Sequence, residues 1–387
     1  MKIAITIVCV TFFLVGCGSF PTKFENVQKD EYRLLDIIFE PAEAAPGDTV
    51  HVKAVFGGKK ITPADIDWKI SYNVVTNMYG STDTAFDFKP FTVRETNFSN
   101  TTTCMEWSFV VPDDILYTSG GIPNNWLSLV PSEFRSEIPS KYQTLTKKQM
   151  IDTISALATV NPQILQLVAE SNPELANIVP FMCQFLTVKV RIYGKIKNDY
   201  LIRSNYSVRY NRVFEKAPAL GVSVNRNPVI DSLGIYKVKG NVDEFDSTNK
   251  AYTFYRIDKV DNQNQVIKIE KDYTYFVEVF TNNPDSSRTL LDLQRGTMKP
   301  EKYITQWFFA MDSSESNGVN YTKFMDISGD DLREILTPPA SGDIKTFTIW
   351  AQVYDNFANE MNRPMGSMLI EGHGVFEFTK EYLEQFK

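Results

Sequence analysis

Histidine is nearly absent from this chain of 387 residues, which contains only His51 and His373. A Ser-His-Asp triad would have to use one of them, and no strained nucleophile turn accompanies either. His51 alternates with two valines, which predicts a position on the outer face of a strand. His373 stands in a Gly-His-Gly sequence, which predicts a kink or bulge in the last strand, and no partner for it is evident. The chain also lacks a His-Glu-x-x-His motif, a phosphate-binding glycine loop and a dinucleotide-binding motif. These absences argue against the common histidine-dependent and nucleotide-dependent enzymes.

An excess of positive charge is missing as well, because the chain has 40 Lys and Arg residues and 47 Asp and Glu residues. Binding of nucleic acid needs clustered Lys and Arg side chains that neutralise phosphates. The net charge of −7 therefore predicts no nucleic-acid partner. The many acids leave one enzyme class as an alternative, since a pair of carboxylates at the right separation can hydrolyse a glycosidic bond. Our main expectation is that the chain is not an enzyme, with a glycoside-acting enzyme as the lesser alternative.

Long apolar runs are missing after residue 16, and the single short run lies at the N-terminus. It extends from Ile3 to Val15, follows Lys2 and is broken only by two threonines. A membrane-spanning helix needs roughly 20 apolar residues, so this run is too short. A basic start, a short apolar run and small residues before a cut are typical of a secretory signal peptide. The sequence therefore predicts an exported protein.

The end of the apolar run carries the most specific motif of the chain, Leu-Val-Gly-Cys at residues 14–17. It resembles the lipobox of bacterial lipoproteins. This resemblance implies cleavage between Gly16 and Cys17, a signal peptide over residues 1–16 and acyl chains on Cys17; an ordinary secretory signal is the alternative. Two or more acyl chains hold a protein stably in a membrane. In enteric lipoproteins, an Asp directly after the lipidated Cys retains the protein in the inner membrane. This chain has Gly18 at that position, which favours sorting to the outer membrane of the cell envelope. Residues 17–32 are then a lipidated tether.

Cysteine is scarce too, with four residues in all. Cys9 leaves with the signal peptide and Cys17 carries lipid, so Cys104 and Cys183 remain. In an exported protein these two could form a disulfide and close a loop of about 80 residues. The alternative is two buried free thiols. No histidine lies nearby in sequence, so the pair predicts no metal site.

Alternation of apolar and polar residues dominates the mature chain and predicts half-buried β-strands. Turn sequences rich in Gly and Pro separate the early strands, as in short antiparallel strands of a β-sandwich. In the first half, the residues expected to share one face within each strand are Leu35, Ile37 and Phe39; Val50, Val52, Ala54 and Phe56; Trp68, Ile70, Tyr72 and Val74; Met105, Trp107, Phe109 and Val111; and Leu186, Val188, Val190 and Ile192.

The period changes to that of helices between residues 112 and 182. Thr146 and Gln149 have the spacing of a capping box, and Met150 begins an apolar helical face. Two Asn-Pro pairs, at residues 161–162 and 172–173, predict further helix starts. They faintly resemble the short helices of STI1-type adaptor modules, although good capping chemistry alone explains them. We therefore expect a helical insertion, whose two exits Cys104 and Cys183 flank.

A linker over residues 216–228 is expected to precede a second all-β unit over residues 229–387. Short motifs, such as Pro46-Gly47-Asp48-Thr49-Val50 and Val353-Tyr354-Asp355-Asn356, resemble bacterial immunoglobulin-like and PKD-like domains. The predicted fold is mainly β, with two tandem immunoglobulin-like β-sandwiches. The first covers residues 33–215 and carries the helical insertion. Each unit has a tryptophan in its third main strand, Trp68 and Trp307, so the two could be diverged copies of one fold.

Two weaker candidate sites remain. Trp126 follows a Gly-Gly-Ile-Pro-Asn-Asn sequence outside the main strands, where it could stack on a sugar or contact a partner; the alternative is an anchor that packs the insertion. Asp326, Asp330 and Asp331 could bind Ca²⁺ around a turn at Gly329, although the spacing is not that of an EF-hand and a solvated turn is the alternative. Apart from lipid on Cys17 and this weak calcium site, no cofactor and no other metal is expected.

Taken together, these features predict a non-enzymatic, lipid-anchored protein of the cell envelope that binds or positions a partner. The partner, a protein or a polysaccharide, is expected at the sandwich loops and the helical insertion, because loops on a rigid scaffold carry function readily. The first alternative is a carbohydrate-binding accessory lipoprotein, which predicts a row of exposed aromatic residues across one sheet. The second is a structural spacer in an envelope assembly. The glycoside-acting enzyme is the third.

Overall fold

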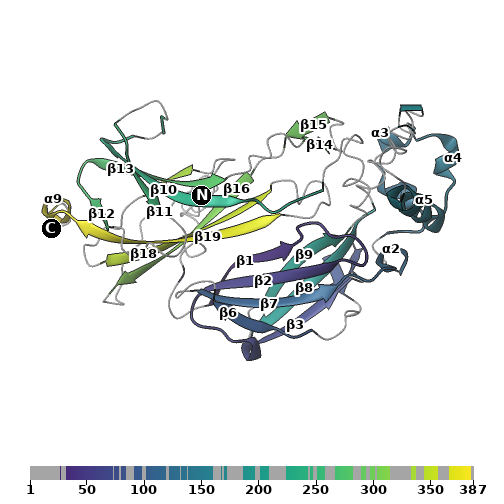
Figure 1. The fold of residues 1–387 in the computed structure, drawn as a ribbon, viewed down its shortest axis with the longest axis horizontal. Helices are drawn as coiled ribbons and strands as arrows, with labels where there is room; N and C mark the ends of the chain where they lie inside the picture. The colour runs from purple at the N-terminus through teal and green to yellow at the C-terminus, as the bar shows by residue number, and fades with distance from the viewer. Residues whose placement is uncertain are drawn as a thin grey trace, which may run out of the picture.

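The computed structural model confirms a mainly β protein built from two β-sandwiches (Figure 1). It describes residues 27, 32–72, 74–77, 80–83, 91–97, 102–118, 122–130, 132–136, 138–159, 167, 170–171, 186–196, 201–208, 224–242, 245–246, 251–257, 266–281, 289–292, 297–300, 303–313, 333–336, 344–355 and 366–384.

The first sandwich has one sheet of four strands and one of three, and every pair within them is antiparallel. The four-stranded sheet has the order β1 (Tyr32–Glu40), β2 (Thr49–Gly58), β7 (Thr102–Val110) and β6 (Arg94–Asn97). The three-stranded sheet has the order β3 (Ile66–Ser71), β8 (Val188–Ile196) and β9 (Leu201–Val208). The short helix η2 (Pro63–Asp65) and the hairpin β4 (Val74–Asn77) and β5 (Gly80–Asp83) are additions. This strand order is that of a constant-type immunoglobulin domain.

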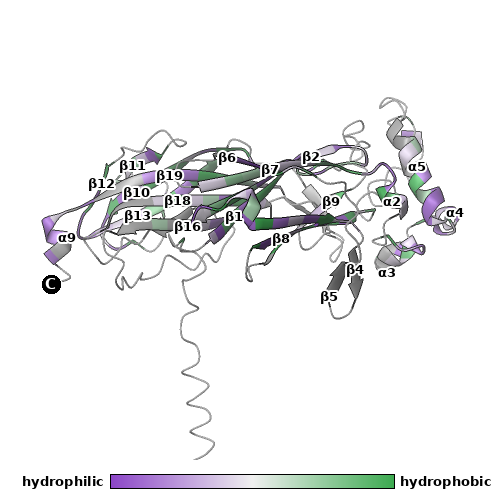
Figure 2. Cartoon of the chain, turned by 90° about the horizontal axis from the view of Figure 1, so that it is seen from below, coloured by the Kyte–Doolittle hydropathy of each residue, from purple (hydrophilic) through white to green (hydrophobic). Residues whose placement is uncertain are grey.

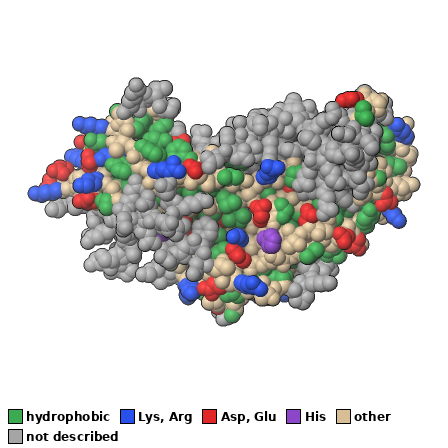
Figure 3. Space-filling model, in the orientation of Figure 1, with side chains coloured by type: hydrophobic (Ala, Val, Ile, Leu, Met, Phe, Trp, Pro, Cys, Tyr) green, Lys and Arg blue, Asp and Glu red, His purple; other side chains and the backbone are tan. Residues whose placement is uncertain are grey.

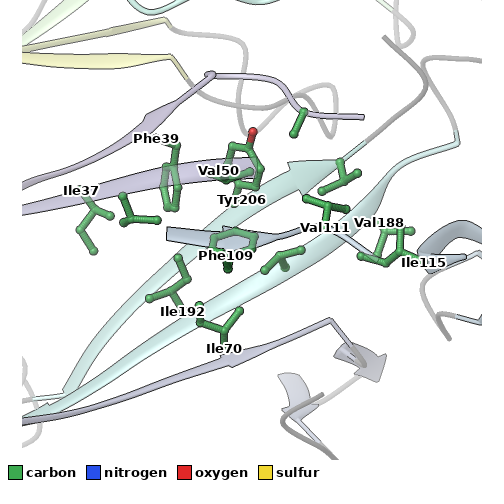
Figure 4. Packing of buried hydrophobic residues seen from close by; sticks show 14 of the residues in the cluster. Ile37, Phe39, Val50, Ile70, Phe109, Val111, Ile115, Val188, Ile192 and Tyr206 are labelled. Carbon is green, nitrogen blue, oxygen red and sulfur yellow. The ribbon is translucent and has the colours of Figure 1, made fainter. Parts of the chain in front are cut away.

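Alternation in the strands fills the space between these two sheets. Val50, Val52 and Ala54 are fully buried on one face of β2, while His51 and Lys53 on the other face are exposed. Figure 4 shows Phe39 and Phe109 of one sheet and Ile70 and Ile192 of the other pointing into this shared core. Trp68 contacts Trp107 across the core, with ring centroids 4.5 Å apart.

One predicted face is wrong. Leu35 was expected beside Ile37 and Phe39, but a register shift between Leu34 and Asp36 interrupts β1. A bulge of this kind reverses the side-chain pattern beyond it. Ile37 and Phe39 therefore point into the core, whereas Leu35 belongs to a separate cluster on the outside of the sheet.

The helical insertion lies between β7 and β8, at one end of the first sandwich (Figure 1). Its described helices are α2 (Ile115–Thr118), η3 (Trp126–Leu129), α3 (Ser132–Arg135), α4 (Ser140–Gln143) and α5 (Lys147–Thr159). The predicted capping box is confirmed, since the Gln149 N–H donates to Thr146 Oγ1 at 3.2 Å and the Thr146 N–H donates to Gln149 Oε1 at 2.9 Å. Met150 and Ile151 of α5 are buried in the sandwich core. Figure 2 shows hydrophilic and hydrophobic residues mixed along α5, as expected for a helix with one buried face. Both Asn-Pro pairs lie outside the described residues.

The second sandwich has two sheets of four strands. One has the order β11 (Thr253–Ile257), β10 (Ile230–Lys239), β13 (Tyr273–Thr281) and β17 (Arg333–Leu336). The other has the order β12 (Val266–Ile269), β19 (Ser367–Phe378), β18 (Ile344–Asp355) and β16 (Tyr303–Ser313), with β12 parallel to β19. The hairpin β14 (Thr289–Asp292) and β15 (Thr297–Pro300) and the terminal helix α9 (Lys380–Glu384) complete it.

The two sandwiches share a pattern of neighbours. The order β1-β2-β7 of the first matches β10-β13-β17 of the second, and β3-β8-β9 matches β19-β18-β16 read backwards. Trp68 on β3 and Trp307 on β16 thus occupy corresponding strands, and both are buried. This correspondence is what two diverged copies of one fold would show.

The predicted kink at His373 is wrong. β19 pairs with β18 without a register shift, and His373 lies opposite Thr348. The adjacent Gly372 is needed for packing instead. A Cβ atom on it would lie 2.6 Å from Ile257 Cγ2 and 3.0 Å from Leu233 Cδ1, both in the opposite sheet. The two sheets approach closely because residue 372 has no side chain.

Replacing Gly372 with alanine is expected to lower the free energy of unfolding by about 1–3 kcal/mol, because the added methyl group overpacks this contact. Glu377→Ala on an exposed part of β19 is the control and should change it by less than about 0.5 kcal/mol. Denaturant unfolding of the purified variants measures both. Equal stability of Gly372→Ala and the unchanged protein would show that the sheets separate at no cost.

Candidate functional site

Most of the residues predicted to act at a site lie outside the described part of the chain. These are Gly16, Cys17, Cys183, Asp326, Asp330 and Asp331. Within the described part, no group of His, Cys, Asp and Glu side chains is placed to hold a metal ion.

The expected disulfide is not formed at Cys104, which is a buried free thiol. Cys104 lies on the outer face of β7, six residues before the strand ends at Val110. Six residues of strand span about 20 Å, so Cys104 is far from the point where the insertion leaves the sandwich. It belongs to the apolar cluster that also contains residues of the second sandwich, and burial raises the pKa of its thiol.

Trp126 does not form an exposed contact surface. Its side chain is only 3% exposed and packs in the first core. The indole N–H donates a hydrogen bond of 2.8 Å to the carbonyl oxygen of Leu145. Trp126 therefore anchors the insertion to the sandwich, and its proposed role as a ligand contact is withdrawn.

The two histidines have partners that the sequence did not reveal. His51 is exposed as predicted, and its Nδ1 lies 2.7 Å from Ser108 Oγ on the neighbouring strand. His373 Nε2 lies 2.7 Å from Glu371 Oε1, and its Nδ1 lies 3.1 Å from Thr348 Oγ1. Thr348 is only 9% exposed and Glu371 only 2%, so this second group is closed to a substrate and acts as a packing network.

The contact between the two sandwiches is buried and has an apolar part and a polar part; we call this contact the junction. Its apolar part is a cluster with members from both sandwiches, namely Val27, Leu35, Ile38, Val55, Cys104, Phe308, Trp350 and Leu369. β1 of the first sandwich contacts β18 and β19 of the second. Thr102 Oγ1 adds a bond of 2.9 Å to Glu371 Oε2 across it.

The polar part of the junction centres on Asp36. Its carboxylate accepts hydrogen bonds from Ser367 Oγ at 2.8 Å and from Gln352 Nε2 at 2.6 Å, both in the second sandwich. Burial raises the pKa of Asp36 to about 7, and these hydrogen bonds lower it only in part. Nearby, Asn227 of the linker donates to the Phe39 carbonyl at 2.8 Å and accepts from the Ser367 N–H at 3.0 Å. The linker is thus fixed to both sandwiches.

A cleft of about 490 Å³ lies beside the linker. Three carboxylates line it, and each already accepts a hydrogen bond from the protein. Glu43 accepts from the Asn225 N–H, Asp48 from the Ala45 N–H and Glu40 from Asn227 Nδ2, at 2.7–2.8 Å. Glu43 and Glu40 therefore hold the linker, Asp48 holds the loop between β1 and β2, and the cleft is part of the junction.

The most distinctive surface is a group of aromatic residues on the outer face of the sheet β11-β10-β13-β17, which we call the aromatic face. Its members are Tyr236, Phe245, Tyr252, Phe254, Phe276 and Phe280. Figure 3 shows hydrophobic side chains gathered at the upper left, over this sheet. Because the opposite sheet of this sandwich forms the junction, the aromatic face points away from the first sandwich.

Strand pairing places these rings in a row. Phe254 on β11 lies opposite Tyr236 on β10, Tyr236 lies opposite Phe276 on β13, and Phe276 lies opposite Ile335 on β17. The Tyr236 and Phe254 centroids are 4.8 Å apart. Phe245, from the segment between β10 and β11, contacts both Tyr236 and Phe276.

A glycine of β10, Gly234, lies beneath the rings of the aromatic face. A Cβ atom on Gly234 would lie 2.5 Å from a ring carbon of Phe254 and 2.7 Å from one of Phe280. Phe254 is nevertheless 45% exposed, and Tyr236, Tyr252 and Phe280 are partly exposed. The next row of the sheet is charged: the Arg256 guanidinium lies 3.0 Å from the Asp231 carboxylate. The surface therefore combines rigid aromatic rings with a charged border.

The aromatic face was not predicted from the sequence. Tyr275 is fully buried, whereas Tyr252 lies on the outside of the sheet. A signal was present in β10: Leu233 and Ile235 form one apolar face, while Tyr236 and Val238 occupy the other. A strand with apolar side chains on both faces needs a cover on both.

Comparison with known proteins gives no relative: no family model matches the chain, and no curated protein matches it. Among the described residues, no helix is long and apolar enough to cross a membrane.

Proposed function

We propose that this chain is a lipid-anchored, non-enzymatic protein of the cell envelope that binds a protein partner through the aromatic face. The lipobox-like sequence before Cys17 supports the anchor. The row of rings with Phe254 45% exposed is the observation that supports binding. This proposal moves the contact surface from the helical insertion to the second sandwich, since Trp126, Met150 and Ile151 of the insertion are buried in the first core.

The chemistry of the aromatic face favours a protein over a sugar. Protein interfaces are enriched in Tyr, Phe and Arg, and rigid aromatic rings lose little entropy on binding. In this surface the rings contact one another, with Phe254 and Phe280 edge to face. Much of each ring face is therefore used inside the group, whereas stacking on a sugar needs a free flat face. Arg256 at the border adds a side-chain type that is common at binding hot spots.

The anchor is tested by metabolic labelling with a fatty acid in the native host. The chain should take up label and sediment with the envelope, and Cys17→Ser should lose both properties. Label that persists on Cys17→Ser would contradict the proposed anchor.

Phe254→Ala is expected to weaken partner binding at least tenfold while leaving the melting temperature within about 1 °C, because Phe254 is the most exposed ring of the aromatic face. A photo-crosslinking residue at position 254 identifies the partner in intact cells. The affinity of the purified partner for each variant is then measured by calorimetry.

The matched control is Val110, which is 61% exposed on the first sandwich. A crosslinker at this position should give no discrete product, and Val110→Ala should bind normally. The same product from both positions, or normal binding by Phe254→Ala, would contradict the proposed surface.

A second candidate function, carbohydrate binding, is favoured by the same row of aromatic residues, which that function predicts. It is distinguished by affinity electrophoresis in gels that contain envelope or extracellular polysaccharides. Retardation that is lost in Phe254→Ala would replace the protein partner by a glycan. A structural spacer would show neither a crosslinked product at position 254 nor retardation.

A further inference from the structure

The described part of the chain begins at the junction, with Val27. Val27 is only 4% exposed and packs in the junction cluster with Leu35, Trp350 and Leu369. These neighbours come from both sandwiches. The N-terminal segment therefore meets the protein at its middle, before β1 begins at Tyr32.

A glycine in β2, Gly57, leaves room for the Val27 side chain. A Cβ atom on Gly57 would lie 2.8 Å from Val27 Cγ1 and 3.3 Å from Leu35 Cδ1. Val27 thus fills the space that the absent side chain at position 57 leaves. Since the contact is apolar and closed to water, it fixes the end of the tether.

The length of the tether then limits how the protein can sit on a membrane. Val27 lies ten positions after Cys17, and ten residue steps span at most about 36 Å when fully extended. The acyl chains on Cys17 must therefore lie within this distance of the junction.

The second sandwich extends from the junction by nearly the whole of this reach. β19 runs along the long axis from the junction toward α9, and the insertion lies at the opposite end (Figure 1). From Leu369 in the junction to Phe378, nine residues of strand cover about 30 Å, and α9 extends beyond them. If the molecule stood on its α9 end, the junction would lie more than about 30 Å from the membrane, and the chain from Cys17 to Val27 would have to be almost fully extended to bridge that distance.

We infer that the lipid anchor holds this protein at the junction, so that both sandwiches lie along the membrane surface. This inference rests on the lipid attachment in the proposed function. It adds that neither the insertion nor α9 is held at the far end of an upright molecule, away from the membrane.

The test places a donor fluorophore at each end of the molecule and measures energy transfer to acceptor-labelled headgroups in phosphatidylcholine vesicles. Exposed positions are Lys148 on α5 and Glu381 on α9. The chain from Cys17 onward is coupled through that thiol to a maleimide lipid, with Cys183→Ser to keep the coupling specific. We expect similar transfer from both ends, within a factor of two. Several-fold stronger transfer from one end, or no transfer from either, would overturn the inference.

A matched pair of variants tests the role of Val27. Gly57→Val should expel Val27 and lengthen the free tether to the start of β1, which should lower transfer from both ends. Val27→Gly should do the same without adding volume to the sheet, so it applies even where Gly57→Val does not fold. Unchanged transfer in a folded Val27→Gly protein would also overturn the inference.

This design separates the inference from the proposed function. Chemical coupling supplies the lipid whether or not cells attach one, and the vesicles contain no partner. Failure of Cys17 to be labelled in cells would therefore contradict the anchor alone. Unequal transfer in vesicles would contradict the orientation alone.

Discussion

Replacing Trp350 with alanine is expected to uncouple the two sandwiches. Trp350 is 1% exposed and lies at the junction beside Phe308 and Leu369. Its indole nitrogen has no hydrogen-bond partner among the described residues, so the contribution of Trp350 there is packing. Loss of a buried Trp side chain typically costs about 3–5 kcal/mol. Most of this loss should fall on the contact between the sandwiches, because each sandwich has its own apolar core.

Differential scanning calorimetry measures this effect. The unchanged protein should unfold in one main transition, since burial at the junction couples the two halves. Trp350→Ala should show two separated transitions, the first at a clearly lower temperature. Phe254→Ala removes an aromatic ring from the exposed face and serves as the control, with one transition expected. A single transition in Trp350→Ala at the original temperature would show that the junction does not couple the sandwiches.

The mainly β fold followed from the sequence because each strand carries its own alternation. His51 faces solvent as predicted, and Thr146 and Gln149 cap their helix, because both features depend only on neighbouring residues. Leu35 was assigned to the wrong face because a bulge in β1 leaves no mark in the pattern of apolar residues.

The junction could not be predicted, since it joins residues that are distant in sequence. Asp36 and Ser367 are 331 positions apart, and Thr102 and Glu371 are 269 apart. In β1, Asp36 looks like an ordinary solvent-facing residue between two apolar ones. Only the second sandwich makes it a buried carboxylate. The aromatic face could have been suspected from the sequence, because β10 has apolar side chains on both faces. The sequence does not show, however, which of the two faces packs against the partner sheet and which points outward.

Replacing Asp36 with asparagine is expected to remove a pH dependence of stability that the unchanged protein shows between about pH 4 and 7. Burial raises the pKa of Asp36 from 3.8 to about 7 in the folded protein. The folded state therefore holds a proton that the unfolded state releases in this interval. Stability is greatest below about pH 4 and falls as pH rises through 7, by about 4 kcal/mol if Asp36 acts alone.

The hydrogen bonds at Asp36 explain why asparagine is the informative substitution. The Asn carbonyl oxygen can still accept from Gln352 Nε2, and its amide group can donate to Ser367 Oγ. Asp36→Asn should thus match the unchanged protein near pH 4, where Asp36 is protonated and neutral. At pH 8 it should be the more stable of the two, because it carries no buried charge.

Denaturant unfolding of both proteins from pH 4 to 8 measures the difference, and other titrating groups cancel in the comparison. Asp36→Ala is the second variant, since it removes the charge together with the acceptors. It should lose about 1–3 kcal/mol relative to Asp36→Asn at every pH, because Gln352 and Ser367 then lack their buried partner. Parallel stability curves for the unchanged protein and Asp36→Asn would show that Asp36 titrates normally. The junction would then admit water, and the rigid connection between the sandwiches would be contradicted.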